Sequence, residues 1–184
     1  MRITICTIYH TGSYSAAAAF RTAGWAVAPN GGERIGVKLA TLTQRRNDPV
    51  LWAHWRWVDN APWLLRRRVI TMLRDPVAAT ISHWIRHNGD KSHTIREQWQ
   101  KLHKYRGTVD HWVPFEDINE VFARDYDVTL PRLNVTRGHE IQDIYREGEI
   151  KRVRKMLGKH WLSLEAVQDE IAAIYDVAGL PVPL

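Results

Sequence analysis

The segment Arg68-Val-Ile-Thr-Met-Leu73 constrains the fold of this chain most, because it is a short apolar run bounded by charge. A run of this length suits a strand that is buried on both faces, as the strands of a parallel sheet are. Asp75 follows as a candidate helix N-cap, and Pro76 as the first helical residue, where its missing N–H costs nothing. We therefore expect a buried strand over this segment and a helix from Pro76 to about His87.

A second strand-to-helix unit is predicted at the amino terminus. Residues 2–9 are rich in Ile and Thr and predict a strand, and an alanine-rich helix follows a short polar loop and stops near Gly24. Further elements are expected as a loop over 30–37, strands over 49–57 and 108–114, and helices over 62–65, 94–103, 147–157 and 163–175. Strands that alternate with helices predict an α/β fold, a single domain over residues 1–184 in which helices flank a parallel sheet.

Composition limits the partners and the compartment. The chain has 26 Lys plus Arg against 20 Asp plus Glu, and its net charge of +6 favours an anionic partner. The basic residues are scattered, with local clusters only at 66–68 and 151–155, which argues against a nucleic-acid-binding arm. Cys6 is the only cysteine, which excludes an intrachain disulfide and argues against a structural zinc site. With no signal-peptide pattern and no membrane-length apolar stretch, we expect a cytoplasmic protein without a membrane span.

The loop after the first strand, from Tyr9 to Ser15, carries a glycine and several hydroxyl side chains between a strand and a helix. Backbone N–H groups in such a loop converge on an anion, and the helix dipole adds to their field. A glycine in a strand-to-helix turn is also ordinary turn chemistry. The loop is not a Walker A motif, because the spacing and the Gly-Lys-Ser/Thr ending are absent.

A second candidate anion site is Arg74, at the end of the 68–73 strand, with Ser82 eight residues later on the following helix. A guanidinium can hold a phosphate in bidentate fashion, and a hydroxyl can donate one further hydrogen bond. The alternative is an arginine paired with a carboxylate and a serine bonded back into its own helix.

At these residues the sequence resembles the sulfotransferases that use 3′-phosphoadenosine-5′-phosphosulfate (PAPS). In that family, an Arg-x-Pro segment with a serine at this separation holds the 3′-phosphate of the donor. The family's 5′-phosphosulfate loop has the usual form Pro-Lys-Ser-Gly-Thr-Thr. His10 falls on its lysine, and Thr11, Gly12 and Ser13 fall on its Ser, Gly and Thr.

Two further segments extend the resemblance over residues 3 to about 120, and a third candidate lies beyond them, where the resemblance is thin. Trp52-Ala-His54-Trp55, followed by Pro62 to Leu65, is similar to the Lys-x-His-Leu-Pro region, whose histidine is the catalytic base. Phe115 to Ile118 resembles the Tyr-Glu-Asp-Leu segment that borders the nucleotide. Arg137 is a candidate counterpart of the late Arg-Lys-Gly segment that also grips the 3′-phosphate.

The resemblance implies a P-loop NTPase-like sulfotransferase fold, PAPS as the co-substrate donor and no metal. The implied reaction moves a sulfuryl group by in-line displacement to a hydroxyl or amine of a small molecule, sugar, lipid or peptide. His54 and His10 are the implied catalytic residues. The implied donor-binding residues are His10, Thr11, Gly12, Ser13, Tyr14, Ser15, Arg74, Ser82, Phe115 and Arg137.

The chain departs from the family pattern at two of these positions. His10 stands where the family has a permanently charged lysine, and Ser15 stands where a tryptophan commonly stacks on adenine. If residues 49–57 form a strand, Trp52, His54 and Arg56 share one face, and Ala53, Trp55 and Trp57 share the other. One aromatic face would line an acceptor pocket, although tryptophans more often serve packing.

Two other functions fit the same fold. A P-loop kinase or another nucleotide-dependent phosphotransferase would share the anion loop, but the Gly-Lys-Ser/Thr ending and an evident Mg²⁺-holding carboxylate after a strand are absent. A non-catalytic module that binds a nucleotide or nucleic acid is the other alternative, favoured by His10 in place of lysine.

Overall fold

The computed structural model describes residues 2–8, 13–28, 35–87, 89–130 and 150–182. The chain falls into two compact units. Residues 1–73 and 107–134 form the first, which we call the sheet unit, and residues 74–106 and 135–184 form the second, which we call the helical unit. The single domain expected over residues 1–184 stays a prediction.

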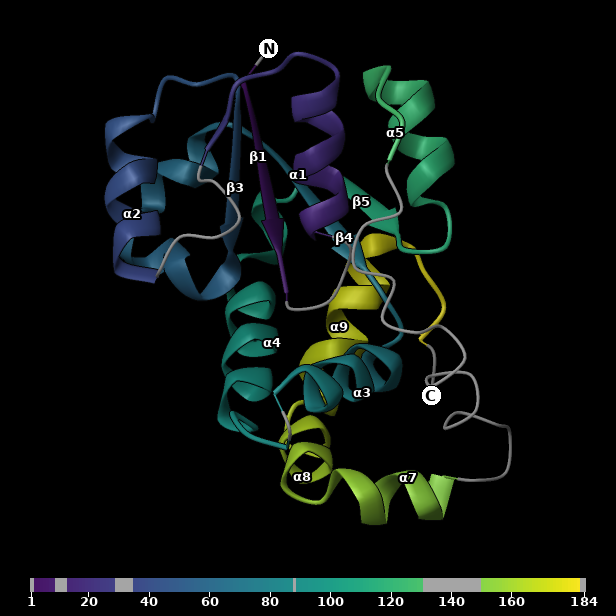
Figure 1. Cartoon of the computed structure of the whole chain (residues 1–184). Coiled ribbons are helices and arrows are strands. Elements are labelled where there is room, and N and C mark those ends of the chain that lie inside the picture. The colour runs from purple at the N-terminus through teal and green to yellow at the C-terminus, as the bar shows by residue number, and fades with distance from the viewer. Residues whose placement is uncertain (1, 9–12, 29–34, 88, 131–149, 183–184) are drawn as a thin grey trace. The chain divides into compact units, whose positions relative to one another are not determined.

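The sheet unit contains a five-stranded sheet in which every pairing is parallel, with the strand order β2-β3-β1-β4-β5. Figure 1 shows β3, β1 and β4 side by side. The strands are β1 (Ile3–Thr7), β2 (Val27–Ala28), β3 (Val50–His54), β4 (Arg68–Leu73) and β5 (His111–Pro114). The predicted α/β class with a parallel sheet is therefore confirmed.

The strand expected over 68–73 is confirmed at both ends as β4, and only Arg68 at its start is exposed. The strand expected at the amino terminus is confirmed as the shorter β1, whose five side chains are all buried. Burial on both faces explains the near-continuous apolar run of β4, whereas β1 keeps two buried threonines among its apolar residues. The two-residue strand β2 was not expected, since so short a segment carries no periodicity.

The strand expected over 49–57 was wrong beyond His54, where β3 ends. The chain then turns into the 3₁₀ helices η1 (Trp55–Asn60) and η2 (Pro62–Arg66), of which the second confirms the short helix expected there. Trp55, Trp57 and Val58 are all buried in η1. Arg56 consequently does not continue the strand face of His54.

One face of the sheet packs against α1 (Ser13–Thr22) and α5 (Ile118–Tyr126). Phe20 of α1 lies at the centre of this core and makes edge-to-face contacts with Phe122 and Tyr126 of α5. Helix α2 (Ile35–Gln44) joins β2 to β3, so the loop expected over 30–37 was wrong for its last three residues. Neither α2 nor α5 was expected from the sequence.

Arg67 joins the amino-terminal ends of the strands. Its guanidinium donates hydrogen bonds to the backbone carbonyls of Ile3, Arg46, Asp48 and Pro49, at 2.6–3.0 Å. Desolvation by burial, followed by the charge of Arg2, lowers the pKa of Arg67 to about 10, so it remains charged at neutral pH. One side chain thus supplies hydrogen-bond donors to four backbone carbonyls.

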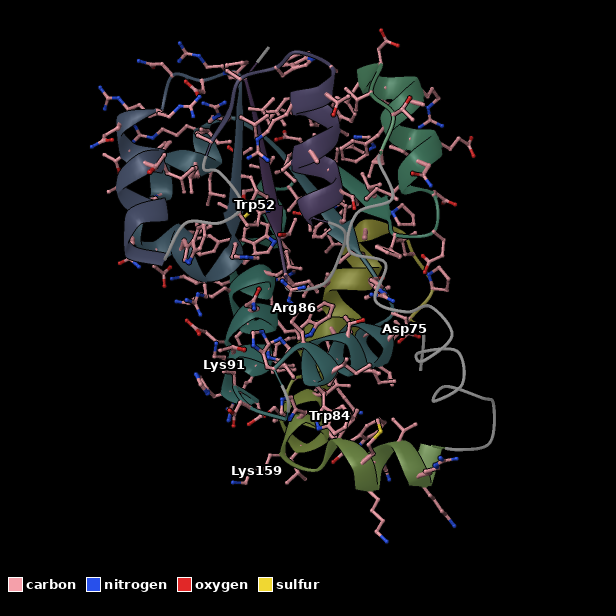
Figure 2. All side chains as sticks on the ribbon, viewed as in Figure 1. Trp52, Asp75, Trp84, Arg86, Lys91 and Lys159 are labelled. Carbon is pink, nitrogen blue, oxygen red and sulfur yellow. The ribbon has the colours of Figure 1, made fainter. Side chains whose placement is uncertain are left out.

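The helical unit begins with α3 (Pro76–Arg86), and the expected cap is confirmed, because the Asp75 carboxylate accepts a hydrogen bond of 2.8 Å from the Ala78 N–H. Figure 2 shows Asp75 at the start of this helix. The other helices of the unit are α4 (His93–Tyr105), α7 (Ile150–Leu157), α8 (Lys159–Glu165) and α9 (Gln168–Ala178), and a short 3₁₀ turn, η3 (Arg106–Thr108), precedes β5.

The single helix expected over 163–175 is instead two helices, α8 and α9, which are separated at Ala166 and Val167. Val167 has the non-helical torsions φ −133° and ψ 22° and is fully buried, so the break turns an apolar side chain into the interior of the unit. Helix α8 packs on α3 and α4, and α9 packs on α4. Within the described part of the chain, no helix combines the length and apolar character that a membrane crossing requires.

Candidate functional site

The carboxyl-terminal edge of the sheet carries the candidate site of the sheet unit. In the strand order β2-β3-β1-β4-β5, the chain leaves β1 for β2 on one side and leaves β4 for β5 on the other. Ligands of open parallel sheets bind outside the carboxyl ends of the strands, where the direction of winding reverses. The reversal here falls between the neighbouring strands β1 and β4, so the carboxyl end of β1 lies at this point.

Part of the predicted anion loop lies in the described residues. Helix α1 begins at Ser13, so Ser13, Tyr14 and Ser15 form its first turn rather than the end of a loop. N–H groups in the first turn of a helix have no partner within the helix, and they face the positive end of its dipole. His10, Thr11 and Gly12 lie outside the described residues, and their roles stay predictions.

His54 lies at the carboxyl end of β3, directly beside the last residue of β1, since Thr7 and His54 are paired in the parallel register. Its side chain is 7% exposed. Because Thr7, Ile5 and Ile3 alternate with Thr4 and Cys6, His54 shares the sheet face that α1 and α5 cover. The fold therefore places this histidine next to the start of the predicted anion loop.

One contact indicates which nitrogen of His54 carries the proton. Nδ1 lies 3.4 Å from the carbonyl oxygen of Thr7, and a carbonyl can only accept. In the neutral ring, Nδ1 therefore donates and Nε2 carries the lone pair. A general base requires such a nitrogen, and the catalytic role expected of His54 stays a prediction.

Two tryptophans enclose the His54 ring. The ring centroids of Trp52 and Trp57 each lie 5.1 Å from that of His54, and both contacts are edge-to-face. Figure 2 shows Trp52 against the strands of the sheet. A continuous strand over 49–57 would have placed Trp57 on the face opposite His54, and the turn into η1 instead brings Trp57 back to His54.

In the helical unit, Arg74 donates a hydrogen bond of 3.1 Å to the hydroxyl of Ser82. Ser82 is fully buried on α3, and Arg74 is partly exposed immediately before the Asp75 cap. The backbone carbonyl of Arg74 accepts a hydrogen bond of 2.9 Å from the hydroxyl of Tyr175 on α9. The structure thus brings together the two residues that were expected to hold a phosphate, with the hydroxyl and the guanidinium adjacent.

Phe115 follows β5 in the sheet unit and is partly buried. Its backbone N–H donates to the carbonyl of Leu73 at 2.6 Å, which extends the pairing of β4 and β5 by one bond. Its carbonyl accepts from Ile118, so the segment turns directly into α5. Phe115 is therefore positioned at the carboxyl edge by backbone bonding.

The predicted residues thus fall into three groups. His54, Phe115 and the first turn of α1 belong to the sheet unit, and Arg74 and Ser82 belong to the helical unit. Arg137 lies outside the described residues, as does the anion loop proper. The convergence of the first loop and Arg74 on one nucleotide stays a prediction.

A histidine cluster in the helical unit was not expected. His83 lies 4.5 Å from His87 and 5.8 Å from His160, measured between ring centroids. In the described ranges, no three His, Cys, Asp or Glu side chains are arranged to hold a metal ion. The three histidines of this cluster therefore do not form a metal site. The spacing of His83 and His87 on one helix face was the only sequence signal, because His160 comes from a distant segment.

A scan of the sequence against protein-family models gives no match, and a search of curated proteins gives none either. The class that the fold defines is an α/β protein with a five-stranded parallel sheet of order 2-3-1-4-5.

Proposed function

We propose that this protein is a sulfotransferase that moves a sulfuryl group from PAPS to a hydroxyl or amine acceptor. The observation that carries the proposal is the hydrogen bond between Arg74 and Ser82, a pair which the family resemblance implies as the holder of the 3′-phosphate. His54 at the carboxyl end of β3, beside the end of β1, supports the proposal from the sheet unit.

The donor would be held by its two charged ends. The partly exposed guanidinium of Arg74 would contact the 3′-phosphate, and the buried Ser82 hydroxyl, which accepts a hydrogen bond from Arg74, would orient that guanidinium. The first-turn N–H groups of α1, from Ser13 to Ser15, would face the 5′-phosphosulfate. His10, when protonated, would act there in place of the lysine of the family.

The transfer proceeds by in-line displacement. The acceptor oxygen or nitrogen attacks sulfur while the bond between sulfur and the 5′-phosphate oxygen breaks, so negative charge grows on that bridging oxygen. N–H donors aimed at this oxygen lower the barrier, as in an oxyanion hole. Nε2 of His54 accepts the proton that the acceptor loses, and the products are the sulfated acceptor and 3′-phosphoadenosine-5′-phosphate.

Ligand-dependent stability tests the donor class. The product 3′-phosphoadenosine-5′-phosphate should raise the Tm clearly, because a ligand that binds only the native state stabilises it by mass action. ATP with Mg²⁺ should shift the Tm little, since it lacks the 3′-phosphate. Equal shifts by both ligands would favour a kinase, and no shift by either would contradict nucleotide binding.

A variant pair tests the 3′-phosphate assignment. Arg74→Ala should weaken binding of the product nucleotide about a hundredfold, as expected when charge-assisted hydrogen bonds to a phosphate are lost. Arg86→Ala removes an exposed arginine of α3 in the same unit and should leave that affinity within about twofold. Full affinity in Arg74→Ala, measured by isothermal titration, would remove Arg74 from the site.

A further inference from the structure

We propose that Trp57 is a positioning residue that holds the ring of His54 with its Nδ1–H toward the Thr7 carbonyl and with Nε2 as the basic nitrogen. The inference rests on the proposed function for the role of His54 in proton transfer. The orientation of the ring, however, can be measured without any substrate.

Three aromatic rings form a mutual cluster at the end of β3. The His54 centroid lies 5.1 Å from both Trp52 and Trp57, with interplanar angles of 69° and 79°. Trp52 and Trp57 themselves lie 6.2 Å apart at 75°. Edge-to-face contacts at these separations are the favoured geometry of aromatic pairs, so each ring restricts the other two.

The contact between His54 and Thr7 is a weak hydrogen bond, because at 3.4 Å it exceeds the usual N–H···O range of about 2.7–3.2 Å. The last side-chain torsion of histidine is broad and roughly twofold, so the ring can turn over and exchange Nδ1 with Nε2 unless its surroundings oppose the rotation. Packed indole walls oppose that rotation, because the ring would have to displace them to turn.

Trp57 contacts His54 through its ring surface and not through a hydrogen bond of its indole N–H. Trp57 is 4% exposed, and within the described part of the chain its Nε1 is buried and has no hydrogen-bond partner. A buried donor without a partner costs about 1–3 kcal/mol. Phenylalanine would keep an aromatic wall and remove that cost, so Trp57→Phe should replace tryptophan in this role.

The structure also shows why sequence spacing did not suggest this contact. Trp57 is three residues beyond His54, and in a continuing strand it would point to the opposite face. The 3₁₀ helix η1 turns the chain and returns Trp57 to the histidine. The contact between Trp57 and His54 therefore depends on the end of β3 at His54.

The experiment uses ¹⁵N-histidine NMR of the full chain at about pH 8, where an ordinary histidine is neutral. The His54 signals are assigned by comparison with His54→Gln. We expect the wild type and Trp57→Phe to show one tautomer with the proton on Nδ1, and Trp57→Leu to show averaged signals.

With an acceptor in hand, kcat should fall about 10- to 100-fold in Trp57→Leu and stay within about threefold in Trp57→Phe. The affinity for the product nucleotide should be unchanged in both variants.

A matched control removes a different edge-to-face tryptophan from the same unit. Trp25 contacts Phe20 at 5.6 Å and 80°, and Trp25→Leu should lower stability while leaving the His54 tautomer unchanged. If Trp57→Leu does not fold, Trp57→Met replaces it, since the flexible, unbranched methionine side chain adapts better to an irregular space and has no ring.

A fixed Nδ1–H tautomer in the folded Leu or Met variant would overturn the proposal. Averaged signals in Trp57→Phe would overturn it as well, because the N–H rather than the ring would then be responsible. A wild type that transfers no sulfuryl group contradicts the proposed function alone, since the NMR result still decides the role of Trp57.

Discussion

Two histidines, His54 of the sheet unit and His83 of the helical unit, are almost equally buried but have different neighbours. Their side chains are 7% and 1% exposed. His54 is enclosed by two indole rings and faces a backbone carbonyl. His83 lies among other bases, with His87 and His160 near its ring and Lys91 close by.

The surroundings of His83 hold it neutral. Desolvation is the largest cause, and the charge of His87 adds to it, so the pKa of His83 is lowered to about 4. The carbonyl of Lys91, 3.3 Å from Nε2, raises the pKa again by hydrogen bonding. The charges of His160 and of the Lys91 ammonium lower the pKa further. Figure 2 shows Lys91 before the start of α4. Burial alone therefore does not identify a catalytic histidine, because the neighbouring groups decide whether it can accept a proton near neutral pH.

The largest expected effect separates the two histidines by activity. His54→Ala should reduce sulfuryl transfer by about 10²- to 10⁴-fold, the usual contribution of a general base, and leave affinity for the product nucleotide within about twofold. His83→Gln should keep turnover within about threefold. Transfer of labelled sulfur to a screened acceptor measures both, and equal losses in the two variants would remove the distinction.

The next effect concerns how the sheet unit is held. Arg67→Met should lower the free energy of unfolding by about 2–4 kcal/mol, because four backbone carbonyls lose a charged donor. Arg66→Met, at an exposed neighbouring position, should cost less than about 0.5 kcal/mol. Urea unfolding compares the two, and a similar cost for both would show that the carbonyl contacts of Arg67 add nothing.

The third effect is the pH dependence of stability from His83. Its folded pKa of about 4 lies below the ordinary value of 6.5, so the unfolded state binds more protons between these values. Stability is therefore fully present above about pH 6.5 and falls as the pH drops toward 4, by about 2 kcal/mol. Urea unfolding at both ends of this window should show the loss in the wild type.

Variants assign that pH dependence to its source. His83→Gln should lose most of it, whereas His93→Gln, at an exposed position on α4, should retain it. An unchanged slope in His83→Gln would mean that His87, whose pKa is also lowered by desolvation, or His111 in the sheet unit carries the effect.

The smallest effect tests the start of the helical unit. Asp75→Ala should cost about 1 kcal/mol, since the N–H of Ala78 loses its acceptor at the start of α3. Asp75→Asn keeps a side-chain oxygen and should cost less than half as much. Thermal unfolding of the two variants distinguishes a cap from a general charge effect, which would make their losses equal.

Local features of the sequence determined the elements that depend on near neighbours. The apolar run of β4, the Asp75 cap and the start of α3 at Pro76 were all expected, because burial, capping and proline geometry act over a few residues. The proximity of Arg74 and Ser82 follows from the same local geometry, since a strand end and the second turn of the next helix are joined by a capped turn.

Only the tertiary structure decided which distant segments meet. The strand order and the approach of His160 to His83 both join residues whose pairing no local period encodes. The physical reason is that these contacts are selected by the packing of whole elements after long loops close, and a side chain's chemistry then depends on neighbours that its own segment does not contain.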